Sequence, residues 1–427
     1  MKTYIGISRM LMNLRIKITT ILYFLPLLFS NEPGLKNFIR FAKRLLFFLS
    51  KMKDNKYVQT GQGLKINLYV PAFPSLAFFQ ACRKVMEFKE KMPAVTVLMS
   101  VTAACRFNCK HCYQKLDKGK DVDIQLLIQT ARYLQDKGMG FFNIEGGEPF
   151  LVFERLQKLV ESIDKRSEIL INSTGDGITP ERLMILNKNG NLSGIMFSLH
   201  TYQSQQLNEF MGSADAWTTL ERGIEACHQV KVPVMFNSCL SRDDYYNGTF
   251  ERVMEKARSF GAVLIQMIKP KPAGGWLESG ADNFTIQDLA LIRGKMIGYN
   301  NLKAFKQYPA IAPMIIDEDR EHFGCTAGGT DRFYINAKGD VQPCEFLNIS
   351  FGNIATEPFE QIYERMRATF VTPGDCWLCE KYSSTIAVLF REYHLTSLPL
   401  PPDLSEKITT GMEQGNTPEF YEKVVKI

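Results

Sequence analysis

The sequence of 427 residues has no internal repeat, no low-complexity tract and no apolar stretch of the roughly 20 residues that a helix needs to cross a bilayer. The uncharged run from Ile18 to Asn31 is too short, is interrupted by Pro26 and lacks a small-residue cleavage motif of signal peptides. With 45% hydrophobic and 22% charged residues, the composition also excludes a disordered chain. These features predict a globular protein with one catalytic domain and one or two smaller units.

Cysteine is present in an informative pattern, because seven of the ten cysteines fall in short spacings that are typical of metal sites. An even number of cysteines would suit disulfide bonds in a secreted protein, but these spacings favour a reducing cytosol. The other three are interpreted as small buried hydrophobic residues, with a thiol that donates a hydrogen atom as the alternative. They are Cys82, Cys227 and Cys239.

The most informative spacing is C-x3-C-x2-C, formed by Cys105, Cys109 and Cys112 directly after a strand predicted at residues 95–102. Three thiolates can bind three irons of a [4Fe–4S] cluster and leave the fourth iron open for chemistry. A zinc site or a reducible thiol pair is the alternative, because both also use closely spaced cysteines.

Strand-like and helix-like segments alternate through the middle of the chain. Strands are expected at 95–102, 141–145, 169–173, 194–199, 234–239 and 262–268, with helices at 124–135, 156–163, 180–187, 216–229 and 250–260. This alternation predicts an α/β fold in which helices cover a parallel sheet. The pattern allows a partial barrel of six strand-helix units or an open doubly wound sheet, and in both the loops at the carboxyl ends of the strands form the site.

A second group of four cysteines follows these segments. The pattern C-x13-G-x4-C runs from Cys325 through Gly339 to Cys344, which a predicted hairpin carries, and C-x2-C adds Cys376 and Cys379. Four thiolates at these spacings suit one auxiliary iron–sulfur cluster or a structural zinc ion.

Residues 93–290 resemble the radical S-adenosylmethionine (radical SAM) superfamily, and the cysteines up to about residue 385 resemble its SPASM and twitch extensions. The resemblance implies a partial (β/α)6 barrel, a [4Fe–4S] cluster on the first three cysteines, and SAM bound to the open iron. Reductive cleavage of SAM would yield a 5′-deoxyadenosyl radical that removes hydrogen from an unactivated C–H bond. One auxiliary [4Fe–4S] cluster of the twitch form is implied, because no further spaced cysteine follows Cys379.

The resemblance also implies a role in SAM binding for the segment Gly146-Gly147-Glu148-Pro149, which begins 34 residues after Cys112. It implies that the backbone oxygens of Gly146 and Gly147 and the carboxylate of Glu148 hold the amino group of SAM. The Pro- and Gly-rich segment 266–276 follows the last predicted strand and is interpreted as packing.

Single polar residues near the ends of other strands complete the implied SAM site. His111 occupies the position of a ring beside the adenine, while Ser198 and Asn237 would present a hydroxyl and an amide to the cofactor, with Ser173 a weaker candidate. This chain has His200 where the family often has Asp. His200 is interpreted as replacing that acid, facing the substrate or capping the surface.

The amino-terminal segment is strongly basic. Residues 1–57 hold eleven Lys and Arg against two acids, which gives them +9 and leaves the rest of the chain at −3. Within this segment, residues 35–53 place Phe and Leu on one side and Lys and Arg mostly on the other. The pattern predicts a helix that lies on the anionic cytoplasmic face of a membrane, and a helix packed on the protein's own body is the alternative.

The predicted organisation has five parts. They are a basic amphipathic arm (1–60), a connecting segment (61–92), the radical SAM core (93–298), a SPASM- or twitch-like auxiliary cluster region (299–400) and a carboxyl-terminal tail (401–427).

Three functions follow from these observations. The preferred hypothesis is a cytoplasmic, peripherally membrane-bound radical SAM enzyme that acts on a lipid or another membrane-held substrate. The alternatives are a maturase that modifies a peptide or protein, and a non-catalytic, membrane-tethered metal-binding module. The expected partners are an electron donor such as flavodoxin or ferredoxin, the lipid or peptide substrate and a membrane surface, with no nucleic acid.

Overall fold

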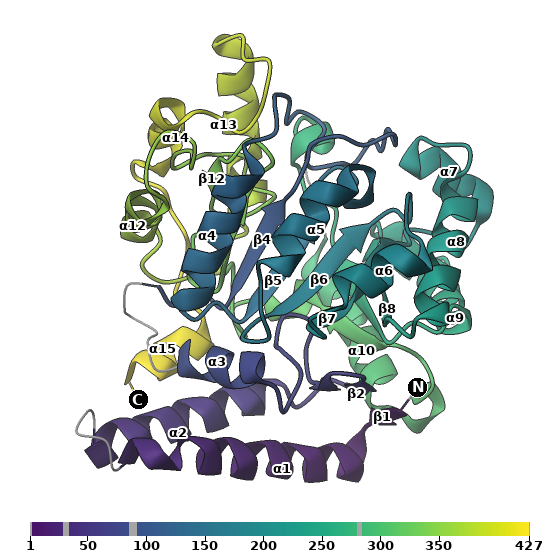
Figure 1. Cartoon of the computed structure of the whole chain (residues 1–427), viewed down its shortest axis with the longest axis vertical. Coiled ribbons are helices and arrows are strands. Elements are labelled where there is room, and N and C mark those ends of the chain that lie inside the picture. The colour runs from purple at the N-terminus through teal and green to yellow at the C-terminus, as the bar shows by residue number, and fades with distance from the viewer. Residues whose placement is uncertain (1, 29–33, 85–91, 280–283, 427) are drawn as a thin grey trace.

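The computed structural model describes residues 2–28, 34–84, 92–279 and 284–426. Figure 1 shows a curved sheet with helices along its outer side. Seven strands that follow one another in the sequence are parallel in this sheet, which confirms the predicted fold class. They are β4 (Thr96–Ser100), β5 (Phe141–Glu145), β6 (Glu168–Ser173), β7 (Leu192–Ser198), β8 (Val234–Cys239), β9 (Leu264–Ile268) and β10 (Ala310–Pro313).

The strand order distinguishes the two architectures that the sequence allows. From β4 to β10 each strand lies beside its predecessor, with no reversal of direction along the sheet. A doubly wound sheet reverses its order at a switch point, whereas this order is that of a barrel wound in one direction. The helices along the chain between these strands are α4 (Ile124–Asp136), α5 (Phe153–Glu161), α6 (Pro180–Leu186), α7 (Ser204–Met211), α8 (Ala216–Gln229), α9 (Thr249–Ser259) and α10 (Ile286–Asn301).

Side chains from alternate strand positions fill the amino-terminal end of the barrel. Leu170, Met196 and Met235 point into one apolar cluster there, together with Leu68 from the segment before the barrel. Lys65, from the same segment, forms a buried ion pair of 3.1 Å with Glu168 at the start of β6. This end of the barrel is therefore closed by the chain itself, and the open end is the carboxyl one.

The carboxyl-terminal region continues the same sheet. Strand β11 (Arg332–Ile335) pairs in parallel with β4, and β12 (Val341–Gln342) pairs antiparallel with β11, which forms the predicted hairpin before Cys344. The predicted boundary between core and extension, at residue 298, falls inside α10. The remaining elements are α11 (Met314–Asp317), α12 (Phe359–Thr369), α13 (Leu378–Glu392), α14 (Pro402–Thr409) and α15 (Glu419–Lys426), with short 3-10 turns η2 (Pro149–Val152), η3 (Asp243–Tyr245), η4 (Gly274–Trp276) and η5 (Lys303–Phe305).

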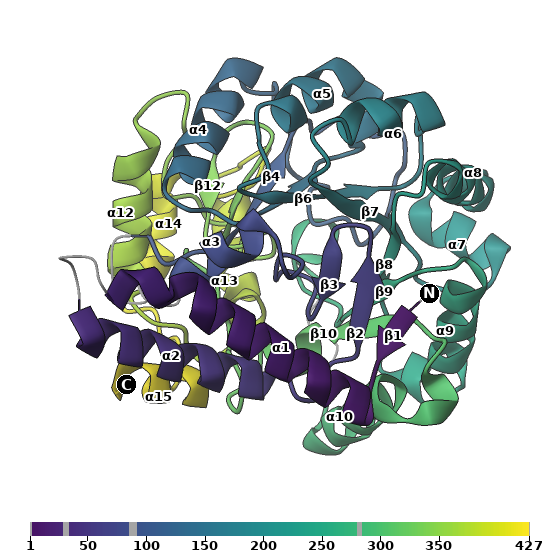
Figure 2. The ribbon, with the colours of Figure 1, turned by 60° about the horizontal axis from the view of Figure 1, so that its bottom comes forward.

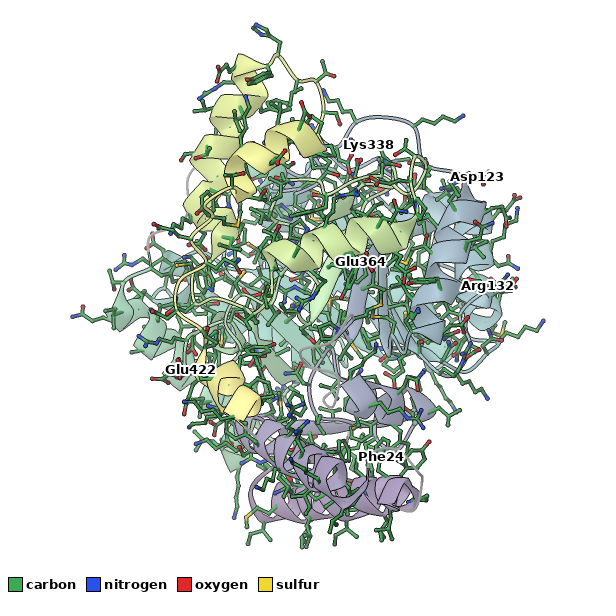
Figure 3. The ribbon with its side chains drawn as sticks, turned by 90° about the vertical axis from the view of Figure 1, so that its left-hand side faces the viewer. Phe24, Asp123, Arg132, Lys338, Glu364 and Glu422 are labelled. Atoms are coloured by element: carbon green, nitrogen blue, oxygen red, sulfur yellow. The ribbon has the colours of Figure 1, made fainter. Side chains whose placement is uncertain are left out.

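The amino-terminal elements lie across the closed end of the barrel, as Figures 1 and 2 show. Helices α1 (Gly6–Phe24) and α2 (Gly34–Lys51) lie side by side there, and Figure 3 places Phe24 in the layer that they form. The turn η1 (Leu25–Leu28) follows α1, α3 (Leu76–Lys84) lies above the pair, and β1 (Lys2–Tyr4), β2 (Tyr57–Thr60) and β3 (Gly63–Lys65) form a small antiparallel sheet.

The apolar side of α2 is buried in the protein, unlike the preferred prediction. Phe41, Leu45 and Leu49 are each 1% exposed and pack in a cluster with Phe24 of α1 and Phe78 of α3. The helix that the sequence predicts to face a membrane thus uses its Phe and Leu side to hold α1 on the protein body. Residues 29–31, at the end of the uncharged run, lie outside the described residues.

Candidate active site

A cavity of about 720 Å³ lies at the carboxyl ends of the parallel strands. Parallel strands bring these ends to one edge, so motifs that are far apart in the sequence meet here. Of the residues predicted to bind the catalytic cluster or SAM, Glu148 alone does not line this cavity. Those that do are Cys105, Cys109, His111, Cys112, Gly146, Gly147, Ser198 and Asn237.

The loop that carries the three cysteines follows β4 and is held by backbone hydrogen bonds. The Asn108 amide donates to the Met211 carbonyl at 3.2 Å, and the Gly275 amide donates to the Cys112 carbonyl at 2.9 Å. Burial raises the pKa of Cys109 to about 12, so its thiolate is costly without a cation. Bound iron would offset that cost, because the thiolate is the form that binds metal.

The two glycines of the G-G-E-P turn are required by the cysteine loop that packs on them. A Cβ atom at Gly147 would lie 2.2 Å from the Ala104 carbonyl oxygen, and one at Gly146 would lie 2.5 Å from the Thr102 oxygen. The Gly147 amide donates to that Thr102 oxygen at 2.7 Å. The glycines thus allow the G-G-E-P turn to pack closely on the cysteine loop. Their backbone also borders the cavity.

Glu148 binds the turn to the next strand. Its fully buried carboxylate accepts hydrogen bonds from the Ser173 hydroxyl at 2.8 Å and from the Thr174 amide and hydroxyl at 2.7 and 2.6 Å. Burial raises the pKa of Glu148 to about 7. The carboxylate thus pairs with the end of β6 and the residue after it, and the backbone of Gly146 and Gly147 is the part of the motif that lines the cavity. The contact of Glu148 with SAM stays a prediction.

An aromatic group borders the cavity beside the cysteines. The ring of His111 lies 4.7 Å from that of His200 and 4.4 Å from that of Phe210, with Trp276 at 5.7 Å. His200 is buried and its Nδ1 accepts from the Cys239 amide at 3.0 Å, so it does not cap the surface. Burial lowers the pKa of His111 to about 4, which keeps its ring neutral at physiological pH.

Several buried polar atoms of residues that line the cavity have no hydrogen-bond partner among the described residues. Among them are His111 Nδ1, Asn172 Oδ1, His200 Nε2 and Asn237 Oδ1. Leaving such atoms unpaired is costly, so their presence at one cavity indicates that a polar ligand pairs with them. A cavity with three thiols, exposed glycine backbone and these atoms fits an iron–sulfur cluster together with SAM.

The second cysteine group lies beside the cavity. The thiols of Cys325, Cys344 and Cys379 are close enough to affect one another, and burial raises the pKa of each, that of Cys379 to about 12. Cys376 precedes α13 and packs against Gly415, where a Cβ atom would lie 2.7 Å from its sulfur.

No three His, Cys, Asp or Glu side chains of the described chain are arranged to hold a single metal ion. A zinc ion would draw its thiolates onto one centre, whereas a cluster separates them on different irons.

Lys269 and Lys271 connect the cavity to the second cysteine group, although the sequence predicts only a packing role for their segment, 266–276. Both line the cavity and form ion pairs with Glu380, at 2.8 and 3.1 Å. Their Nζ atoms lie 4.3 and 3.6 Å from the ring centre of Trp377. The position of K-P-K directly after β9 was the signal in the sequence that could have identified them.

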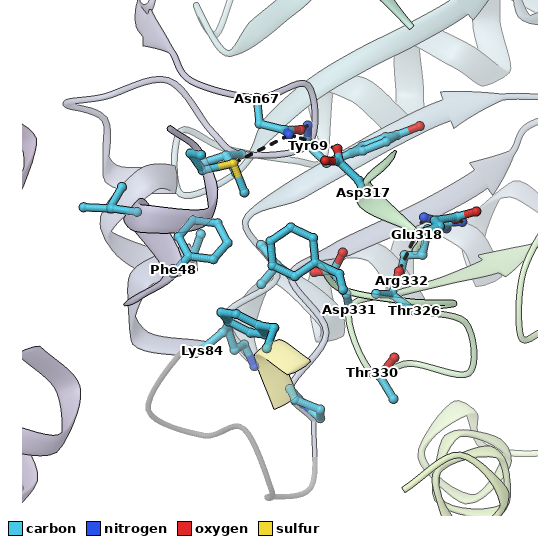
Figure 4. A pocket seen from close by; sticks show the side chains of 18 of the residues that line it. Phe48, Asn67, Tyr69, Lys84, Asp317, Glu318, Thr326, Thr330, Asp331 and Arg332 are labelled. Carbon is cyan, nitrogen blue, oxygen red and sulfur yellow. Dashed lines mark hydrogen bonds and ion pairs between the residues drawn. The ribbon is translucent and has the colours of Figure 1, made fainter. Parts of the chain in front are cut away.

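A second cavity, of about 170 Å³, lies at the closed end of the barrel between α2, α3 and the start of the strands (Figure 4). Its lining is mostly apolar, and several of its polar members pair with one another. Asn67 donates to Asp317 at 3.3 Å, and Arg332 pairs with Glu318. It contains none of the catalytic candidates, so the larger cavity is the candidate active site.

Comparison with known families distinguishes an enzyme from a non-catalytic metal-binding module. Residues 99–260 match the profile of the radical SAM superfamily, and residues 325–383 match that of the SPASM iron–sulfur cluster-binding domain. This chain belongs to the radical SAM superfamily. It is an enzyme with a catalytic [4Fe–4S] cluster and SAM as cofactors, and its SPASM domain binds auxiliary iron–sulfur.

This chain matches most of the length of several curated relatives, at low sequence identity. An AdoMet-dependent heme synthase of Nitratidesulfovibrio vulgaris is 20% identical over 70% of this chain and 88% of its own length. A probable GTP 3′,8-cyclase of Methanothermobacter marburgensis is 23% identical over 60% of this chain and 86% of its own.

Solved structures share the fold. SuiB of Streptococcus suis, bound to its precursor peptide SuiA, superposes with a TM-score of 0.53 at 15% identity, over 67% of this chain and 69% of that one. The enzyme anSMEcpe with bound AdoMet gives 0.51 at 15% identity, over 78% and 95%. Both likenesses support the partial barrel with its carboxyl-terminal extension.

None of the helices in the described parts of the chain is long and apolar enough to cross a bilayer.

Proposed function

We propose that this radical SAM enzyme removes a hydrogen atom from an unactivated carbon of an anionic substrate that enters the 720 Å³ cavity from the aqueous side. The observation that supports it is the meeting of the cysteine run, the glycine turn and two lysines in that one cavity. With cluster and SAM bound, reductive cleavage of SAM supplies a 5′-deoxyadenosyl radical.

The proposed roles follow the placement of each side chain. Cys105, Cys109 and Cys112 would bind three irons, and the backbone of Gly146 and Gly147 would accept hydrogen bonds from the amino group of SAM. The Ser198 hydroxyl, the Asn237 amide and the free Nδ1 of His111 would pair with other polar groups of SAM. Glu148 acts as a positioning residue, because its carboxylate fixes the turn.

An anionic substrate is supported by the charge at the far wall of the cavity. Lys269 and Lys271 share the single carboxylate of Glu380, so these three side chains together carry a net charge of +1. Both lysine side chains are buried, where an added anion is attracted more strongly than in water. The name of one curated relative, a GTP cyclase, denotes an anionic substrate of this kind.

A peptide substrate is the second candidate, supported by the precursor peptide in the SuiB structure and the peptide in that of anSMEcpe. A lipid substrate comes third. The cavity opens at the carboxyl ends of the strands, whereas the basic amino-terminal helices lie at the opposite end, so a lipid in a bilayer beneath those helices is remote from the cysteines.

Supply of electrons is part of the proposal, with a flavodoxin or ferredoxin as the donor class. So is peripheral contact of α1 and α2 with the cytoplasmic face of a membrane, which is supported by the exposed apolar side chains of α1. The predicted division into five parts stays a proposal as well.

Product formation from defined pools tests the substrate class. Anaerobically reconstituted enzyme with SAM and dithionite is given a pool of soluble organic acids and nucleotides, a peptide pool or a lipid extract. We expect a mass-shifted product and stimulated release of 5′-deoxyadenosine with the first pool only. A product from peptides or lipids alone would replace the proposed class.

A charge variant provides the control. Lys269→Gln with Lys271→Gln should keep the basal cleavage of SAM and lose stimulation by the anionic pool. Unchanged stimulation in this variant would contradict the role of the two lysines.

A further inference from the structure

An ordinary surface helix buries its apolar side and exposes its polar one. Helix α1 buries Ile16 and Phe24, but it also exposes a second set of apolar side chains on its outer side. Six large apolar side chains of α1 are exposed by 50–78%. They recur at intervals of three and four residues and thus form one continuous stripe along the helix. We call this stripe the α1 ridge, and its members are Ile7, Met10, Leu11, Leu14, Ile18 and Leu22.

Three polar residues of α1, Arg9, Asn13 and Thr20, lie on the side toward the protein. Arg9 donates to the Asn55 carbonyl at 3.0 Å and pairs with Asn301, and Asn13 donates to the Tyr57 hydroxyl at 3.0 Å. Thr20 is fully buried. These contacts to segments far along the chain fix the rotation of α1, so the ridge must face outward.

The position of the ridge leaves it uncovered. Figures 1 and 2 show α1 on the outer side of the molecule, at the closed end of the barrel, with α2 beside it. A helix of 19 residues is about 28 Å long, so the ridge is a far larger apolar feature than the single exposed side chains that are normal on a surface. Exposed apolar area of this extent indicates a surface that another apolar phase covers.

Charge around the ridge decides what covers it. Neither α1 nor α2 contains an acidic residue, and Arg15, Lys36, Arg40 and Lys43 are exposed on the two helices. A second copy of this chain would bring like charges together at its interface. Anionic lipid headgroups would neutralise them, and a stripe of aliphatic side chains beside Lys and Arg is the pattern of helices that lie in the membrane interface.

We propose that the α1 ridge inserts into the surface of an anionic lipid bilayer, with α1 parallel to the membrane plane and the basic side chains of α2 on the headgroups. This deepens the membrane contact proposed above and does not depend on the proposed reaction. The cavity then faces the aqueous side, away from the bilayer. The segment predicted from the sequence, residues 35–53, serves to hold α1 in place and to supply charge.

Vesicle sedimentation with the full reconstituted chain tests the proposal. Wild type should sediment with vesicles of phosphatidylcholine and phosphatidylglycerol, less with phosphatidylcholine alone, and less at high salt. The variant Leu11→Gln/Leu14→Gln/Ile18→Gln should lose about tenfold in partitioning for each side chain replaced, which corresponds to about 1.4 kcal/mol. Replacing Lys36, Arg40 and Lys43 with Gln should cost about fivefold per charge on anionic vesicles only.

A control variant on another part of the surface and a measurement of SAM cleavage distinguish loss of membrane binding from misfolding. The variant Ile286→Gln/Leu302→Gln/Val371→Gln removes three side chains of similar exposure elsewhere on the surface and should partition like wild type. Release of 5′-deoxyadenosine, measured on every sample, should stay unchanged in all variants, which shows that they are folded. Wild type that does not sediment, ridge variants that sediment equally, or a dimer in light scattering that the ridge variants dissociate would each overturn the proposal.

Discussion

The Nζ atom of Lys271 lies 3.6 Å from the centre of the Trp377 ring. Lys271 lines the candidate active-site cavity, and Trp377 stands between the two cysteines of the C-x2-C motif. A positive charge thus sits at the wall that separates the catalytic cysteines from the second group. In a low-dielectric interior such a charge stabilises the reduced, more negative state of a nearby cluster.

We therefore predict that Lys271→Met lowers the midpoint potential of the auxiliary cluster by about 30–60 mV, the one-electron equivalent of losing a moderate charge interaction. Potentiometric titration followed by electron paramagnetic resonance measures this. The control Lys407→Met removes an exposed lysine that contacts Tyr393 and should leave the potential unchanged. An unshifted potential in Lys271→Met would place the auxiliary cluster away from this wall.

Gly147→Ala should displace the cysteine loop, because the added Cβ atom meets the backbone of that loop. Its Cβ atom would lie 2.2 Å from the Ala104 oxygen, so the cysteine loop has to move. We expect a loss of about 1–3 kcal/mol in the free energy of unfolding, as for overpacked sites, together with a lower iron content after reconstitution.

The comparison variant is Gly294→Ala in α10, where an added Cβ atom meets nothing within 4 Å. It should be neutral or stabilise the protein by about 0.5–1 kcal/mol. Equal iron content and equal stability of the two variants would show that the turn does not constrain the cysteine loop.

The buried carboxyl group of Glu145 should make the free energy of unfolding depend on pH. It is buried at the end of β5, where burial raises its pKa to about 8 even though Asn172 donates a hydrogen bond of 3.0 Å to it. The folded protein therefore keeps a proton that the unfolded chain releases near pH 4.5. Stability should fall as pH rises between those two values, by about 1.4 kcal/mol per pH unit from this group.

Glu145→Gln removes the titrating group and keeps its shape. The variant should show a shallower decline of the free energy of unfolding between pH 5 and 8, and it should exceed wild type at pH 8. Urea unfolding of the metal-free protein at several pH values checks this. Parallel curves for the two proteins would mean that Glu145 is ionised in the folded state.

Much of the core could be predicted from the sequence because its signals are local. Apolar strands flanked by periodic helices revealed the parallel sheet, and cysteine and glycine spacings marked residues such as Cys112 and Gly146 that the sheet brings to one edge. The order of the strands could not be predicted, since it depends on pairing between residues that are far apart in the chain.

Other features depend on which atoms meet a side chain. Periodicity shows which residues share a side of a helix, but not whether protein or lipid covers that side. The sequence therefore predicts membrane contact for the Phe and Leu side of α2, whereas the structure buries Phe41, Leu45 and Leu49 of that side in the protein. The inward position of Arg9 depends on Asn55 and Asn301, which no local pattern reveals. Likewise the hydrogen bonds that occupy Glu148 come from the end of β6.

The most direct test of the account is the release of 5′-deoxyadenosine by anaerobically reconstituted enzyme with SAM and dithionite. Wild type should release it, while Cys105→Ala/Cys109→Ala/Cys112→Ala should release none and should fall from about eight irons to about four, because the second cysteine group keeps its cluster. Release of 5′-deoxyadenosine by the triple variant at the wild-type rate, or wild-type protein that holds a full complement of iron and releases none, would contradict the central claim.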